Sequence, residues 1–206
     1  MKQKHFIDAH KGATPVVVTL LIALYGQWRN PTALLYLALH GTYGILWITK
    51  SRVFPDRQWE QKCSLWYGLY LWFGLALYWI SPWLLTMRGV RAPAWYQATC
   101  VSMYAVGVFL HFVADMQKHV ALTIRPEHMV MDGLFSRCRN INYFGELLIY
   151  SGFGLLAMHW APAAVLAFFL LVIWLPNMRR KDRSLSRYPQ FADWKKSSSF
   201  FIPFVW

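Results

Sequence analysis

Apolar stretches separated by short polar segments dominate the hydrophobic pattern of this chain. Each approaches the length of about 20 mostly apolar residues that a helix needs to cross a bilayer. The sequence therefore predicts about six transmembrane helices, at residues 14–28 (a short one), 31–48, 63–85, 95–112, 141–158 and 160–176. Because one or two residues separate the first pair and the last pair, each pair should form an antiparallel hairpin. Pro82 should end or kink the third helix, since proline lacks an amide hydrogen.

The basic residues fall unevenly between the two faces of this predicted bundle. With six helices both termini share a face, and eighteen of the 21 Lys and Arg residues lie on that face. Cytoplasmic loops of membrane proteins carry such an excess of positive charge, so we expect both termini in the cytoplasm. The asymmetry also accounts for the net charge of +12 without a nucleic-acid partner. We expect a multi-pass protein, of a bacterial inner membrane, whose active site faces the cytoplasm.

The composition agrees with a single all-α membrane domain over residues 1–206. Hydrophobic residues make up 57% of the chain and aromatic residues 18%. The tail after residue 176 mixes aromatic and basic side chains, which predicts an interfacial segment lying on anionic lipids. The three cysteines have no metal-binding or disulfide spacing, and we expect no cleavable signal peptide.

The segment 132–148 carries polar side chains into the fifth predicted helix. Asn142 and Glu146 are four residues apart and share one helical face. A carboxylate inside a membrane span is costly, which makes this segment a predicted functional site. The alternative is a helix cap with a glutamate near the lipid headgroups.

The end of the fourth predicted helix has a second polar stripe. His111, Asp115, Lys118 and His119 share one face. They could form the polar wall of a cofactor pocket or a solvated helix end, and the two alternatives are equally favoured. A metal site with three ligands is disfavoured because the Lys118 ammonium would repel a cation, so we predict no metal.

Two further groups lie at or near the first two helices. His40 and Tyr43 form a stripe with Trp47 and Lys50 that could donate protons within the membrane or join helices through hydrogen bonds. Asp8, followed by His10 and Lys11, should precede the first helix. There it would act as a polar cap or fold over the mouth of a pocket.

Several of these motifs resemble a known superfamily. The run GLFSRCRNINYFGE and the closing RYPQFADWKKSSSFFIPFVW are similar to the C-terminal part of steroid 5-alpha-reductases. That superfamily also contains the DUF1295 proteins, the sterol delta-14 reductases and the isoprenylcysteine carboxyl methyltransferases. Upstream, LHGTYGILWITKSRVFPD resembles the small DUF1295 proteins, so the chain is identified as a DUF1295-type relative of the reductases.

The resemblance implies an NADPH-dependent enzyme that reduces a conjugated C=C bond of a lipid-soluble enone, steroid-like or prenyl-type, taken from the bilayer. The cofactor-binding half would be residues 111–206, in which Asn142 and Glu146 would hold the nicotinamide and Asp115 and Lys118 would line the cofactor. The other residues implied in cofactor binding are Arg137, Arg139, Tyr143, Asn177, Arg180 and Lys181. The reductases have His and Tyr where this chain has Asn177 and Lys181, which is a departure.

The reductases protonate substrate with a Glu and a Tyr. The corresponding positions here hold Asp8 and, nearby, Tyr43 or His40, which are therefore the implied catalytic residues. The alternative enzyme is an S-adenosylmethionine (SAM)-dependent methyltransferase of a lipid or prenyl-cysteine carboxylate, although the His-Pro pair of that branch is missing. A non-enzymatic scaffold or lipid-binding protein is the third alternative. The sequence leaves the oligomeric state open.

Overall fold

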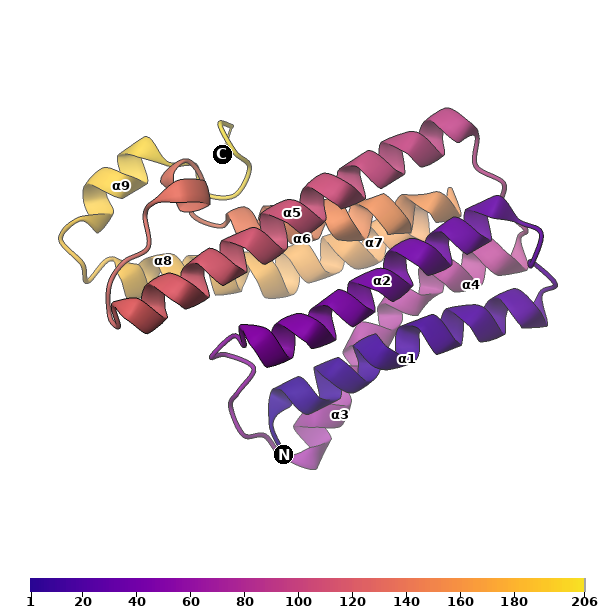
Figure 1. Cartoon of the computed structure of the whole chain (residues 1–206), viewed down its shortest axis with the longest axis horizontal. Helices are drawn as coiled ribbons and strands as arrows, with labels where there is room; N and C mark the ends of the chain where they lie inside the picture. Colours follow the sequence, from indigo (N-terminus) through magenta and orange to yellow (C-terminus); the bar gives the residue numbers. More distant parts are fainter. Residues whose placement is uncertain (206) are drawn as a thin grey trace. The chain divides into compact units, whose positions relative to one another are not determined.

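A computed structural model describes residues 1–205 and shows an all-α protein (Figure 1). Within this part of the chain there is no β-sheet, only two isolated bridges. The helical elements are α1 (Gln3–Leu24), α2 (Pro31–Val53), α3 (Leu65–Ala76), η1 (Leu77–Trp79), α4 (Ile80–Met87), α5 (Ala94–Ile124), η2 (Gly133–Ser136), α6 (Ile141–Gly154), η3 (Leu155–Ala157), α7 (Trp160–Phe169), η4 (Leu170–Trp174), α8 (Leu175–Leu185) and α9 (Phe191–Ser197). The fold is thus the predicted helical membrane bundle.

The helices belong to two compact units. The first unit comprises Met1–Tyr104 and Tyr150–Val165, and the second comprises Ala105–Ile149 and Leu166–Trp206. In the first unit α1 packs along α2 and α3 (Figure 1). In the second unit the C-terminal parts of α5 and α8, the start of α6 and the tail surround a small apolar core.

Among residues 1–205, five helical stretches are long and apolar enough to cross a membrane. They are Gln3–Leu24, Pro31–Val53, Leu65–Met87, Ala94–Ile124 and Trp160–Leu185. The fifth predicted helix, at residues 141–158, also exists, but α6 has only 14 residues and continues through the three residues of η3. The chain is therefore a multi-pass membrane protein, and α6 is not one of these five stretches.

The first helix begins at Gln3, so the expectation that Asp8, His10 and Lys11 precede it is wrong. Pro15 lies inside this helix and cannot donate a hydrogen bond to the Lys11 carbonyl four residues earlier. Gly44 of α2 lies against that carbonyl, where an added Cβ atom would clash. The close packing of α2 covers the irregular turn, and the helix continues through the proline.

Two other prolines also lie within continuous helical segments. Pro82 follows the 3₁₀ turn η1 and does not end the helix, which runs to Met87. Pro176 follows the π-helical stretch η4, and α8 continues to Leu185, so the predicted end at residue 176 is wrong. Changes of hydrogen-bond spacing such as these accommodate the missing proline donor.

The tail packs against its own unit. Phe191 and Trp194 of α9 are buried with Phe135 and Ile141, and the Trp194 Nε1 donates to the Phe135 carbonyl at 3.0 Å. Phe201 is also buried. By contrast Phe204 is 85% exposed, which leaves it available to lipid, whereas Trp206 lies outside the described residues.

Candidate functional site

The two polar stripes predicted separately on α5 and α6 meet in the second unit. A Cβ atom on Gly145 would lie 2.5 Å from the His111 amide nitrogen and 2.8 Å from the Gly107 carbonyl oxygen, so the two backbones are in contact. This approach places α5 side chains against the first turn of α6. Glycines allow such packing because they have no side chain to separate the helices.

Asp115 is the centre of this cluster. It is 4% exposed, and its Oδ1 accepts a hydrogen bond from Asn142 Nδ2 at 3.0 Å. Lys118 Nζ lies 3.7 Å from the same oxygen, and His111 Nε2 lies 3.8 Å from Oδ2. His111 Nδ1 donates to the main-chain carbonyl of Asn142 at 3.1 Å. The Lys118 ammonium and the Asn142 amide hydrogen bond therefore compensate the charge of this carboxylate within the protein.

Asn142 retains an unused acceptor. Among the described residues, its buried Oδ1 has no hydrogen-bond partner. Such an atom costs about 1–3 kcal/mol unless a ligand or water supplies a donor. Glu146 is half-buried one turn further along α6, on the same face. The site therefore offers hydrogen-bond acceptors beside the basic Lys118.

Arg139 connects α6 to the tail. It is 4% exposed, and its Nε donates to Asp182 Oδ2 at 3.1 Å. One terminal nitrogen donates to the Ser198 carbonyl at 2.6 Å, the Ser198 hydroxyl at 3.1 Å and the Lys195 carbonyl at 3.3 Å. Lys181 Nζ donates to the Arg139 carbonyl at 2.6 Å. Both cations therefore hold the tail in place.

Cys138 precedes Arg139 and belongs to the same connection. Its Sγ lies 3.2 Å from the Phe201 carbonyl, and burial raises the pKa of the thiol. The thiol is consequently protonated at neutral pH and acts as a hydrogen-bond donor.

The other residues implied in cofactor binding have varied surroundings. Tyr143 packs its ring 6.0 Å from that of Trp174, and Asn177 is half-buried on α8. Arg137 and Arg180 are exposed and available to a phosphate. Among residues 1–205, no group of three or more His, Cys, Asp or Glu side chains is placed to hold a metal ion.

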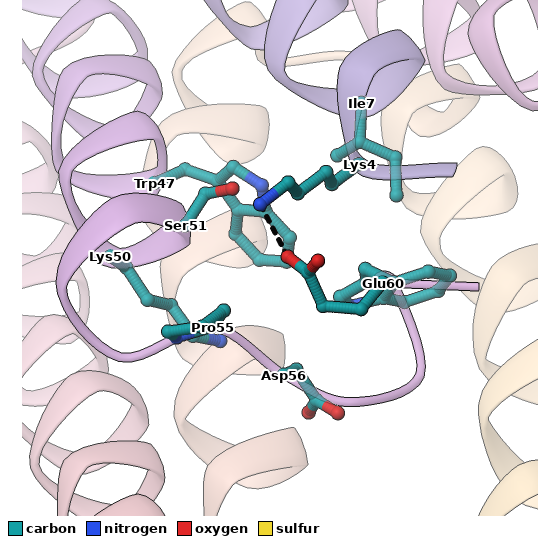
Figure 2. Close-up of a pocket in the computed structure, with 9 residues that line it drawn as sticks. Lys4, Ile7, Trp47, Lys50, Ser51, Pro55, Asp56 and Glu60 are labelled. Atoms are coloured by element: carbon teal, nitrogen blue, oxygen red, sulfur yellow. Dashed lines mark ion pairs between the residues drawn. The ribbon is translucent and has the colours of Figure 1, made fainter. Parts of the chain in front are cut away.

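The three implied catalytic residues lie in the first unit. Tyr43 is fully buried, and His40 is 1% exposed with its Nδ1 hydrogen-bonded to Tyr36 Oη at 2.9 Å. Asp8 is half-buried on α1 and accepts a hydrogen bond from Ser51 Oγ at 2.8 Å. Ser51 lines a shallow hollow, open to solvent, between the start of α1, the end of α2 and the 54–60 segment (Figure 2).

Lys11 lies within an aromatic cluster, whereas the sequence predicted for its segment a polar cap or a place over the mouth of a pocket. It is 2% exposed, and its Nζ donates to Tyr150 Oη at 2.6 Å. The same nitrogen lies 4.5 Å from the centre of the Tyr43 ring, 5.2 Å from Trp47 and 5.0 Å from Tyr150. The only indication in the sequence was that Lys11 lies just before the predicted helix 14–28, which is short for a membrane span.

Together these features define a multi-pass helical membrane protein with a buried polar cluster in each unit. A family model described as "Protein of unknown function (DUF1295)" matches residues 1–197, so the chain belongs to this family. The predicted DUF1295 relationship is thereby confirmed.

A curated relative has a more specific name. The chain is similar to the cobalt-zinc-cadmium resistance protein CzcN of Cupriavidus metallidurans, with 29% identity over 142 residues. The match covers 68% of this chain and 57% of that protein. The chain therefore matches little more than half the length of this relative.

Proposed function

We propose that this protein is an NADPH-dependent reductase of a conjugated C=C bond in a lipid-soluble enone. The observation that carries the proposal is the buried Asp115–Asn142 pair with its unused Asn142 carbonyl oxygen, in a chain of the DUF1295 family. Its Asn-Tyr-x-x-Glu pattern resembles the reductase branch of the superfamily, as described above.

The residues of the second unit fit a nicotinamide cofactor. The Asn142 Oδ1 would accept a hydrogen bond from the carboxamide NH₂, and Asp115 holds the Asn142 amide in that orientation. Arg137 and Arg180 are exposed and could bind phosphate through bidentate contacts. Arg139 and Lys181, which are also implied in binding, serve the cofactor indirectly by keeping the tail folded.

NADPH, when bound, supplies a hydride. The protein itself must orient the cofactor, exclude water and provide a hydrogen-bond donor for the substrate oxygen on which negative charge develops. Tyr43, His40 and Asp8 were the residues implied for that donor. Tyr43 and His40 lie among aromatic side chains that suit a substrate taken from the lipid, whereas Asp8 lies in polar surroundings beside Ser51.

Ligand-dependent thermal stability tests the proposal. NADPH at a hundredfold excess over its Kd should stabilise the purified protein by about 2.7 kcal/mol. Asn142→Ala and Glu146→Gln should abolish the shift while leaving the unliganded protein folded. Glu127→Gln is a matched control because Glu127 is exposed in the loop after α5.

Separate incubations with SAM and with Zn²⁺ distinguish the alternatives. Stabilisation by SAM alone would favour a methyltransferase of a lipid carboxylate. Stabilisation by Zn²⁺ alone would favour a role related to the metal resistance named for CzcN. No shift with any of the three would contradict the reductase and favour a scaffold or lipid-binding protein.

A further inference from the structure

We propose that Arg179 and Arg183 of α8 bind the headgroup of an anionic phospholipid, whose acyl chains lie along the exposed apolar face that precedes them. The site lies in the second unit and does not depend on the reductase proposal. It gives a ligand to two arginines that no part of that proposal uses.

The contacts of α8 within its own unit determine which of its side chains face outward. Asp182 Oδ2 accepts a hydrogen bond from Arg139 Nε at 3.1 Å, and Met178, one turn earlier, is fully buried. These contacts fix the rotation of the helix about its axis. Arg179 and Arg183 are also one turn apart, and both are exposed. Their guanidinium groups are therefore available to a ligand outside the protein.

The protein does not neutralise either of these charges. Within residues 1–205, neither Arg179 nor Arg183 forms an ion pair or a side-chain hydrogen bond, and the adjacent Asp182 is bonded to Arg139. A guanidinium group binds phosphate through two parallel hydrogen bonds, which suits arginine to this anion better than lysine. Two such groups one turn apart therefore favour a phosphate-containing headgroup with a net negative charge.

An exposed apolar face leads directly to the two arginines. Phe168, Leu171 and Val172 are between 49% and 61% exposed and belong to the same helical stretch, which ends at Leu185. Pro176, which is also exposed, lies between these apolar residues and the arginines. In a bilayer such a face contacts acyl chains, so one lipid can contact both parts of the helix.

The length of the stretch places the arginines at the level of the lipid phosphates. Trp160–Leu185 has 26 residues, which at about 1.5 Å per residue make a helix about 39 Å long. Trp160 is 74% exposed, as is typical of a tryptophan at a membrane interface. Since the hydrocarbon core is about 30 Å thick, about 9 Å of helix, or roughly six residues, extends beyond the opposite boundary. Arg179 lies at that boundary and Arg183 lies just outside it.

Two simpler explanations of these arginines make different predictions. Basic residues at the end of a span determine its orientation during insertion, and that role requires no bound lipid. It predicts equal contact with anionic and zwitterionic lipids once the protein is folded. General attraction by the net charge of +12 predicts a preference for anionic lipids that the loss of any two cations reduces equally. The proposed site predicts a preference that depends on α8.

Photo-crosslinking in lipid nanodiscs measures this preference at the site. The full chain is reconstituted in phosphatidylcholine with a trace of phosphatidylglycerol, or of phosphatidylcholine, that carries a diazirine in one acyl chain. Labelling of residues 166–178 is then quantified by mass spectrometry. The phosphatidylglycerol probe should label this segment roughly 5- to 25-fold more than the phosphatidylcholine probe, since each arginine should contribute about fivefold.

Paired substitutions test the dependence on the two arginines. Arg179→Gln together with Arg183→Gln should bring the labelling ratio close to one, and Arg179→Lys together with Arg183→Lys should keep most of it because the charge remains. Arg57→Gln together with Arg125→Gln is the matched control, because both arginines are exposed in loops and the same charge is removed. The control should keep the wild-type ratio. Excess glycerol 3-phosphate should not reduce labelling, because it lacks the chains that contact the apolar face.

The contrary results are distinct from one another. A ratio near one in the unsubstituted protein would overturn the site and leave these arginines with the topological role. An equal loss in the control pair would reject it in favour of attraction by net charge, and displacement by glycerol 3-phosphate would replace it with a site for free phosphate. An unchanged ratio in the Arg179 and Arg183 glutamine pair, with loss of NADPH stabilisation, would assign these arginines to the cofactor instead. A ratio that depends on the two arginines would support the lipid site even if NADPH does not stabilise the protein.

Discussion

Replacing Arg139 by Met should separate the tail from the start of α6. The substitution keeps an apolar stem of similar length but removes the donors to Asp182, Ser198 and the Lys195 carbonyl. It also leaves the Asp182 carboxylate, which is 15% exposed, without its cationic partner. The variant thus tests whether this buried cation determines the fold of the second unit.

The geometry gives the expected magnitude. Removing one member of a buried ion pair costs about 3–5 kcal/mol. Asp182 retains some contact with solvent, so we expect the lower end, a loss of about 3 kcal/mol in the free energy of unfolding. Asp182→Asn keeps an acceptor for Arg139 Nε but leaves the buried guanidinium without an anionic partner, so its cost should approach the same value, about 3 kcal/mol.

Unfolding by sodium dodecyl sulfate in mixed micelles measures these losses, and trypsin cleavage after Lys195 and Lys196 reports release of the tail. Because the two side chains are in contact, the double variant should be more stable than the sum of single losses predicts, by about 1–2 kcal/mol. Wild-type stability in Arg139→Met, or additivity of the two substitutions within about 0.5 kcal/mol, would refute the reasoning.

Three further predictions concern helix packing, pH and topology. Gly145→Ala should destabilise the protein by about 1–3 kcal/mol because the added methyl group meets the α5 backbone, whereas Gly74→Ala, with nothing within 4 Å, should be neutral or stabilising in the same unfolding assay. Hydrogen bonds from Lys2 and Lys4 lower the pKa of Glu60. The stability that the ionised Glu60 contributes should therefore be complete above pH 4.5, its ordinary pKa, and should be lost as the pH falls through its lowered pKa in the folded protein. The Lys4 amide donates a hydrogen bond to the Trp59 carbonyl. As the pH is lowered, the hydrogen-exchange protection factor of this amide should decrease by an amount equivalent to less than about 1 kcal/mol, and Glu60→Gln should remove this pH dependence. Green fluorescent protein fused to either terminus should fluoresce, and alkaline phosphatase there should be inactive. Active phosphatase at the C-terminus alone would show that α6 does not span.

The long helices and one part of the polar cluster in the second unit could be predicted from the sequence. Apolar stretches predicted every long helix, and helical periodicity placed Asn142 and Glu146 on one face. The α5 stripe containing Asp115 was identified separately, and Asn142 proved to be its partner at 3.0 Å. The glycines that bring these helices together are visible in the sequence, but their contact partners are not.

The roles of Lys11 and Arg139 could not be predicted from local patterns. A lysine near an apolar stretch normally indicates the end of a span, whereas Lys11 is buried by Tyr150, which lies 139 residues later. The predicted start of the first helix at residue 14 and the predicted end of the last at Pro176 failed for a related reason, because tertiary packing compensates for the missing proline donors. These features depend on contacts between distant segments, which hydropathy does not describe.

The position of the Arg139 partners along the chain affects how the protein is made. The carbonyls that satisfy this cation lie 56 and 59 residues downstream. At about 5–20 residues per second, the ribosome needs roughly 3–12 s to synthesise that stretch after Arg139. Throughout this interval the guanidinium must remain in water or on lipid phosphates at the entrance of α6. The second unit can therefore close only after α7 and α8 have been inserted, which makes it the later of the two steps in the biogenesis of the bundle.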